Sequence, residues 1–165
     1  TSMADIIAES GLSAGAIYGY FPGKKALIRG VAAQVIGDRR TDLLAASARH
    51  PLSPAEIATL LIDGVRTHAP VQALVQLWSE ATVDDELRAL ITETIGGMRE
   101  TIATALTAWA STHPDTLPPD ADAVAWAHAA APTLMGLIPG FAVQRALLAD
   151  FDEERYLRGI ALLLP

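Results

Sequence analysis

The sequence from Ser2 to Leu27 predicts two short helices that meet at a glycine, followed by a third helix that begins with lysines. Ser2 is suited to cap the first helix, with Asp5 three residues later as its capping-box-like partner. Gly11 supplies the positive φ at which that helix ends. A second short helix that follows such a break is typical of a helix-turn-helix, whose second helix lies in the major groove of DNA. We therefore expect this segment to contact DNA.

The predicted second helix, which Ser13 caps, has small residues at positions 14–16 that let its backbone approach base edges closely. Tyr18 and Tyr20 each join an apolar ring to a hydroxyl, a combination suited to phosphate contact. Simple packing is the alternative for these tyrosines. We assign packing to Ile17 and Phe21, which share the apolar face of the motif.

The order of residues in this segment resembles the DNA-binding signature of the TetR family of bacterial transcriptional regulators. The resemblance rests on Ser13, Gly15, Ile17, Tyr18, Tyr20, Phe21, Lys24 and Leu27. It implies contacts to bases or near bases from Ser13, Ala14 and Gly15, and phosphate contacts from Tyr18, Tyr20 and Lys24.

Three residues depart from the usual signature: Ile7 stands in place of a small alanine, Gly23 in place of a Ser or Thr cap, and Lys25 in place of a common Glu. A glycine cap costs only about a few tenths of a kcal/mol relative to serine, so the departure at Gly23 leaves the interpretation intact. The resemblance also implies a helix ahead of Thr1 that packs behind the recognition helix. We expect that helix to be disordered rather than cut from the chain, because termini fray when nothing orders them.

Charge is distributed unevenly along the chain, whose net charge is -7. Residues 1–50 carry six Lys and Arg against four Asp and Glu, whereas the remainder carries six against fifteen. A mildly basic segment ahead of an acidic one would concentrate phosphate attraction at one end of the protein. The chain has no cysteine and no recognisable targeting segment, so we expect a cytoplasmic protein without disulfides.

Helical periodicity continues after the motif, and no strand alternation is visible, which predicts an all-α fold. We expect a DNA-binding head with its connecting helix at residues 1–48 and a helical effector-binding and dimerisation domain at residues 49–165. The connecting helix should run from Lys24 to about Ala48. We assign Leu27, Val31, Val35, Leu43 and Leu44 to its buried side.

Capping residues and prolines mark the later helices. Ser53 and Pro54 begin a helix that ends near His68, Pro70 begins the next, and Asp84 caps a long one. The proline-rich stretch 113–120 predicts a loop, and Asp152 should cap the last helix.

Residues 123–143 carry no charge, which raises the question of a membrane span. The segment is rich in Ala and Gly, is interrupted by Pro132 and Pro139, and follows the acidic Asp120 and Asp122, so we reject a span. A helix that is apolar on all sides must be covered on all sides. We therefore expect the helices at about 120–144 and 152–164 to form a homodimer interface, which is also what the family resemblance implies.

Large adaptable side chains recur on the helical stripes of the second domain, which predicts a mainly apolar effector pocket with one polar group. Its candidate residues are Trp78, Met98, Trp126, Met135 and Phe141, with His128 as the polar group. An ordinary filled core is the alternative. No catalytic cluster, phosphate loop or metal-ligand spacing is evident, so we expect neither an enzyme nor a cofactor or metal.

These features predict a repressor that binds a palindromic operator in double-stranded DNA and is released by a small apolar or aromatic effector. Two alternatives stay open. One is a helical small-molecule-binding protein or enzyme that shares only the N-terminal motif. The other is a DNA-binding protein without a sensor, which a solidly packed body would favour.

Overall fold

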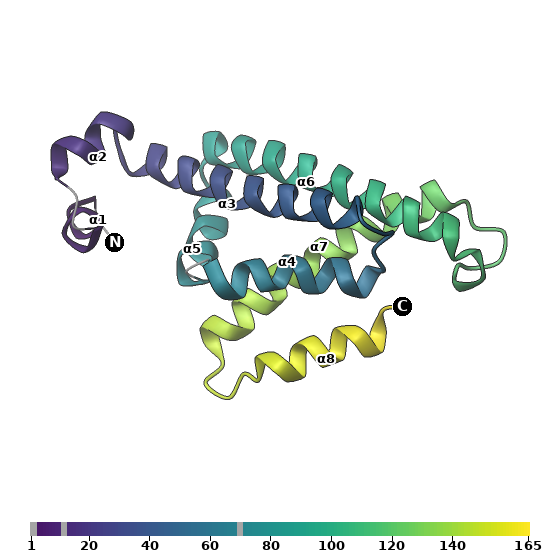
Figure 1. Ribbon diagram of the computed structural model, residues 1–165. Coiled ribbons are helices and arrows are strands. Elements are labelled where there is room, and N and C mark those ends of the chain that lie inside the picture. The colour runs from purple at the N-terminus through teal and green to yellow at the C-terminus, as the bar shows by residue number, and fades with distance from the viewer. Residues whose placement is uncertain (1–2, 11–12, 69–70) are drawn as a thin grey trace.

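The computed structural model describes residues 3–10, 13–68 and 71–165, and all regular structure in this part of the chain is helical (Figure 1). The all-α prediction is confirmed. The helices are α1 (Met3–Ser10), α2 (Ala14–Tyr20), α3 (Lys24–Ser47), α4 (Pro54–His68), α5 (Val71–Ala81), α6 (Asp85–Thr112), α7 (Ala123–Leu147) and α8 (Glu153–Leu163). A short 3-10 turn, Pro114–Thr116, lies between α6 and α7.

Side-chain caps fix where several of these helices begin. The Ser53 and Glu56 side chains cap α4 reciprocally: the Ser53 amide donates to Glu56 Oε2 at 2.8 Å and the Glu56 amide donates to Ser53 Oγ at 3.2 Å. The side chains of Asp84 and Asp152 accept hydrogen bonds from the backbone amides of Leu87 and Arg155, which confirms both caps predicted from the sequence. Asp122 caps α7 in the same way.

The helices form an elongated body with α1 and α2 at one end (Figure 1). The connecting helix α3 runs beside α6, while α7 packs against α4, α5 and α6, and α8 lies along α4. One hydrophobic core joins these helices, and its fully buried side chains include Leu43, Ile57, Ile62, Leu106 and Phe141.

One position on the connecting helix differs from the sequence prediction. Leu43 is completely buried, but its neighbour Leu44 is 52% exposed, so its assignment to the buried side was wrong. Successive residues of an α-helix point about 100° apart, and only one of two adjacent leucines faces the body here. The side chains of Val31 and Val35 lie outside the described residues.

Helix α7 continues through both of its prolines and divides into two faces. Ala127, Ala131, Leu134, Phe141 and Ala142 are buried in the core. The opposite face carries no charged side chain from Val124 to Val143 and is exposed over much of its length. Among the residues that the structure describes, no helix has the length and apolarity that crossing a membrane requires.

The C-terminal end of α7 is joined to α8 by an aromatic cluster. The rings of Phe141, Phe151 and Tyr156 meet edge to face at centroid distances of 5.5 to 5.7 Å. The Tyr156 hydroxyl donates to the Leu137 carbonyl of α7 at 2.9 Å, and burial raises the pKa of this phenol. This cluster fixes the angle at which α8 returns along the body.

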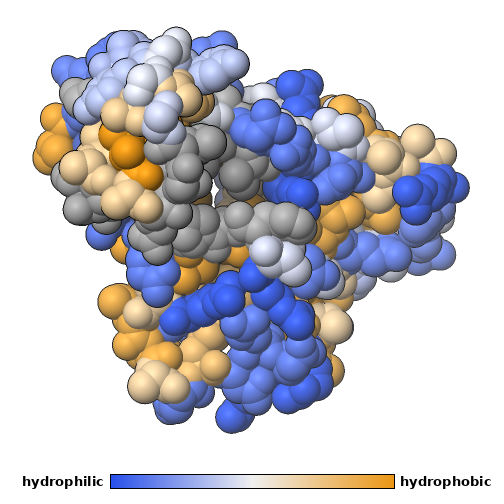
Figure 2. Space-filling model, turned by 60° about the vertical axis from the view of Figure 1, so that its left-hand side comes forward, coloured by the Kyte–Doolittle hydropathy of each residue, from blue (hydrophilic) through white to orange (hydrophobic). Residues whose placement is uncertain are grey.

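A charge network reinforces the same junction. Arg145 of α7 donates from Nε to Glu153 of α8 at 2.9 Å and from Nη1 to the Arg66 carbonyl near the end of α4 at 3.1 Å. The Arg66 side chain in turn contacts Glu153 and Glu154 at 3.3 and 3.1 Å. Figure 2 shows the hydrophilic surface at this lower end of the molecule, next to hydrophobic patches. The ends of three helices are thereby tied together.

Candidate nucleic-acid interface

Helix α2 begins as the sequence predicts. The Ser13 side chain accepts a hydrogen bond from the Ala16 amide at 3.1 Å, and the Ser13 carbonyl accepts from the Ile17 amide at 3.1 Å. The predicted cap is therefore confirmed. Gly11 and the predicted Ser2–Asp5 cap of α1 involve residues outside the described part of the chain.

Two apolar side chains of the motif turn inward and hold α2. Ile17 is only 6% exposed, and Phe21, just after the helix, is partly buried. The Phe21 ring lies against Gly30 of α3: a Cβ atom at Gly30 would stand 2.6 Å from Phe21 Cε1. Gly30 was not among the residues predicted for this motif. Its signal is an isolated glycine within a helical pattern, which often marks close packing.

The rest of α2 faces solvent. Ser13, Ala14 and Gly15 are exposed at its N-terminus, Tyr18 is 49% exposed and Tyr20 is 84% exposed. The structure thus brings five predicted contact residues together on one short element with no body helix over them. Apart from its own helix, no atom of the described residues lies within 4 Å of a Cβ built on Gly15, so packing among these residues does not require glycine there.

The start of α3 follows Tyr20 closely. Gly23 adopts an extended conformation and makes no side-chain cap, so the first amides of α3 have no side-chain acceptor from this position. Such a helix N-terminus favours negative charge, as a phosphate would supply. Lys24 is the first residue of α3, but its side chain lies outside the described residues. Its predicted phosphate contact stays a prediction.

The predicted effector residues divide into two groups. Met98 and Phe141 belong to the hydrophobic core, and Trp78, Trp126 and Met135 are partly buried against it. Trp126 also lies 5.9 Å from Trp109, ring centroid to ring centroid. These five residues therefore contribute to one continuous apolar interior.

His128 lies elsewhere, and its assignment as the polar group of an enclosed pocket does not agree with its position. Its side chain is 53% exposed on the outward face of α7, with Nδ1 4.0 Å from Glu100 Oε2 of α6. Periodicity places it in an apolar helix, but α7 has only one core-facing side, and His128 is on the other.

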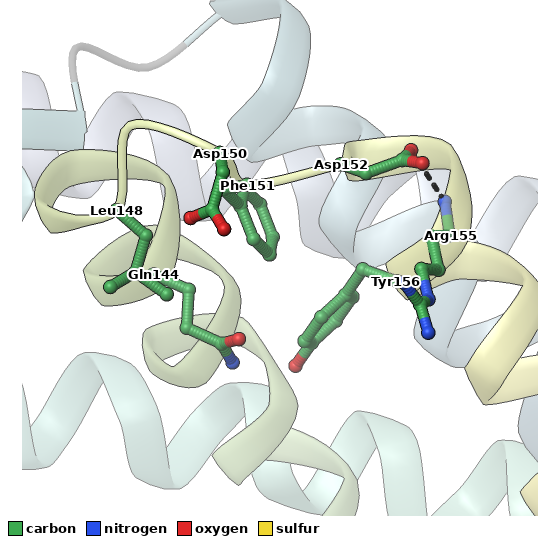
Figure 3. Close-up of a pocket in the computed structure, with 7 residues that line it drawn as sticks. All are labelled: Gln144, Leu148, Asp150, Phe151, Asp152, Arg155 and Tyr156. Atoms are coloured by element: carbon green, nitrogen blue, oxygen red, sulfur yellow. Dashed lines mark hydrogen bonds between the residues drawn. The ribbon is translucent and has the colours of Figure 1, made fainter.

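Two surface cavities lie along α8 and at its junction with α7, and none of those six residues is among their lining residues. The first has a volume of about 280 Å³, and Figure 3 shows the Gln144 amide and the Tyr156 hydroxyl pointing toward the same space. Leu148, Asp150, Phe151, Asp152 and Arg155 complete its lining. The second, of about 570 Å³, is an open groove on α8 beside Arg155 and Arg158. Neither was predicted: the lining of the first comes together only where α8 folds back on α7, and the lining of the second lies along α8 itself.

An exposed second helix of a helix-turn-helix, held by a long helix on an all-helical body, defines a DNA-binding regulator with a separate C-terminal domain. The sequence matches the family model for bacterial regulatory proteins of the tetR family over residues 1–31. It matches the model for the C-terminal domain of BetI-type transcriptional repressors over residues 55–162. The chain therefore belongs to the TetR family, and the protein is a DNA-binding transcriptional regulator with a BetI-type C-terminal domain.

Solved structures support the fold. A protein from Syntrophomonas wolfei assigned to the TetR family of transcriptional regulators superposes with a TM-score of 0.61 at 14% sequence identity. The match covers 97% of this chain and 80% of that protein. No curated protein matches the sequence significantly.

Proposed function

We propose that the protein is a homodimeric repressor that binds a palindromic operator and is released from it by a small apolar or aromatic effector. The observation that carries this proposal is the exposed face of α2, with Tyr18 and Tyr20 presented at one end of the molecule and joined by α3 to the body. Residues 1–48 serve as the head with its connecting helix, and residues 49–165 serve as the sensing and dimerisation domain.

The dimer forms through α7 and α8. Leu162 and Leu163 are 86% and 84% exposed, and Leu147 at the end of α7 is 71% exposed. The outer face of α7 is also uncharged and exposed, with small residues such as Ala129 and Gly136. Large areas of exposed apolar surface are uncommon on a monomer. A second copy related by a two-fold axis covers this surface and brings two recognition helices to about 34 Å, one turn of DNA.

The effector binds within the apolar interior between α5, α6 and α7. Trp78, Met98 and Met135 come from these three helices, and Trp126 and Phe141 extend the same interior along α7. Methionine and tryptophan side chains adapt to apolar ligands by changing rotamer. His128, on the outer face of α7, is not part of this site. A ligand that favours one spacing of the heads shifts the population away from the DNA-bound form.

The test of DNA recognition begins with selection of duplexes from a random pool, followed by footprinting. We expect two protected half-sites with a centre-to-centre spacing of about 10 base pairs or a multiple of it. Light scattering at micromolar concentration should give the mass of two chains. A monomer, or a single protected half-site, would contradict the dimeric mechanism.

A thermal-shift screen of apolar and aromatic compounds tests the sensing role. In Trp78→Ala and Trp126→Ala, a ligand found in the screen should no longer release the protein from DNA while the fold survives. If these residues only pack the core, each variant loses about 3 to 5 kcal/mol of stability with or without ligand. That result, together with a screen without hits, would favour a DNA-binding protein that has no sensor. The complete burial of Phe141 is the observation that favours this alternative.

A further inference from the structure

The connecting helix α3 carries two adjacent arginines that reach different helices of the body. The Arg39 side chain lies over Gly64 of α4. The Arg40 Nε donates a hydrogen bond to Thr101 Oγ1 of α6 at 3.0 Å. Because adjacent residues of a helix point about 100° apart, a single turn of α3 is held against both α4 and α6.

The contact at Gly64 leaves no room for a side chain while Arg39 keeps its present conformation, so an alanine here would displace the arginine. A Cβ atom there would overlap Arg39 Cδ and would stand 3.0 Å from both Nε and Nη1 of the same side chain. The guanidinium group is held by Asp42 of α3, whose Oδ2 lies 3.0 Å from Arg39 Nη1. Gly64 is buried, so the arginine stem fills the notch that the missing side chain leaves in α4.

The contact at Thr101 combines a buried hydroxyl with an exposed arginine. Thr101 is only 7% exposed, and its hydroxyl donates to the Gly97 carbonyl of α6 at 3.0 Å while it accepts from Arg40. The Thr101 hydroxyl keeps its bond to Gly97 when Arg40 is removed. Loss of the arginine therefore leaves no buried donor unsatisfied, and its cost to folding is small.

We propose that Arg39 and Arg40 brace α3 against both body helices and thereby set the position from which the head meets DNA. Arg40 lies 16 residues beyond Lys24, a distance of about 24 Å along the helix. A tilt of about 10° at the brace therefore moves the start of α3 by about 4 Å. Two heads that must fit half-sites one DNA turn apart lose that fit when each is displaced so far. The expected effect on DNA binding rests on the proposed function, whereas the role of the two arginines in positioning α3 does not depend on it.

The brace is tested by a distance within one chain. The protein has no cysteine, so Gly19→Cys in α2 and Ala108→Cys in α6 give two specific spin-label sites. Both positions are exposed. Labelled chains are mixed with an excess of unlabelled protein, so that the measured distance lies within one protomer. In Gly64→Ala, Thr101→Val and Arg40→Ala, we expect the head-to-body distance to shift or broaden by several Å relative to the parent protein.

Two matched variants serve as controls. Gly96→Ala makes the same change in α6 at a glycine where, outside the helix itself, no described residue has an atom within 4 Å of the new Cβ, and Thr101→Ser keeps the hydroxyl. Both should leave the distance unchanged. A distance that is also unchanged in Gly64→Ala, Thr101→Val and Arg40→Ala would overturn the proposal. If Gly64→Ala or Thr101→Val fails to fold, the distance measured in Arg40→Ala tests the proposal, because Arg40 is exposed and its loss should not prevent folding.

DNA binding supplies the second measurement, with unlabelled protein and duplexes selected by the parent protein. The three brace variants should bind roughly 3- to 10-fold more weakly, with an unchanged dependence on salt because no phosphate contact is removed. Thr101→Ser should bind like the parent. A shifted distance with unchanged affinity would overturn the role of the brace in DNA binding. Failure of the parent protein to select any DNA would instead refute the proposed function. The distance measurement would still test whether Arg39 and Arg40 position α3.

Discussion

The recognition helix α2 and the central body helix α6 use their side chains in opposite ways. Helix α2 buries only Ile17 and leaves the rest of its seven residues to solvent, whereas α6 buries nine side chains. A surface that the fold does not need is free to contact DNA. Substitutions in the head should therefore change binding more than stability, and substitutions in the body should do the reverse.

The largest effect should follow from Phe141→Ala in the body. Phe141 is fully buried and contacts both Phe151 and Tyr156 edge to face, so truncation leaves a cavity where α7 meets α8. We expect a loss of about 3 to 5 kcal/mol in the free energy of unfolding, measured by urea denaturation.

Tyr20→Ala in the head is the matched control. Tyr20 is 84% exposed, so its loss should change stability by less than about 0.5 kcal/mol while weakening DNA binding. Comparable destabilisation by the two variants would break the contrast between head and body.

A smaller effect is expected at the charge network that joins the helix ends. Arg145→Ala removes the ion pair with Glu153 and the hydrogen bond to the Arg66 carbonyl. These groups are partly solvated, so we expect a loss of about 1 to 3 kcal/mol, reduced at high salt. The control is Arg158→Ala, whose side chain is 66% exposed and lies 3.9 Å from Asp152. If the two variants were equally stable, the network would contribute nothing beyond surface charge.

Local signals in the sequence predicted the helices well. A cap needs only a few neighbouring residues, so Ser13, Ser53 and Asp152 marked the starts of α2, α4 and α8 correctly. The recognition helix was predictable for the same reason, because its exposed residues lie within one short motif. Local chemistry determines these features wherever the helices pack.

Features that depend on how helices cross were not predictable. The exposure of Leu44 and His128 follows from which side of α3 and α7 meets the body. In α7, which is apolar all round, periodicity does not specify that side, and in α3 two adjacent leucines compete for it. The contact between Arg39 and Gly64 joins residues of two helices at a single crossing point. In the body, the sequence therefore predicted many of the buried residues, but it did not predict which residues of different helices contact one another.

Lys24→Ala tests whether a substitution in the head changes DNA binding. We expect binding to all DNA sequences to weaken by about tenfold at moderate salt, because one phosphate contact is lost without any loss of base readout. The slope of log affinity against log salt concentration should fall by about one unit. Titrations by fluorescence anisotropy at several salt concentrations measure both quantities. Unchanged affinity and slope would remove Lys24 from the interface.

The smallest effect compares the caps of α2 and α4. In α4 the Glu56 carboxylate accepts from the Ser53 amide, and this hydrogen bond lowers the pKa of Glu56 below its usual 4.5 against an opposing effect of burial. In α2, Ala16 occupies the corresponding position after Ser13 and returns no such bond. Only the stabilisation by the α4 cap should therefore change as the pH is lowered.

A carboxyl group whose pKa is lower in the folded state stabilises the fold above the unfolded pKa, and this contribution is lost as the pH falls through the folded pKa. The contribution of Glu56 should decline as the pH falls below about 4.5. Glu56→Gln keeps an acceptor for the Ser53 amide but removes the titration, so its stability should fall less steeply over the acid range than that of the parent. Ser13→Ala should retain the parent's pH profile. Urea denaturation in steps from pH 7 to pH 3 measures all three proteins, and parallel profiles for Glu56→Gln and the parent would show that the Ser53 hydrogen bond does not stabilise the charged carboxylate.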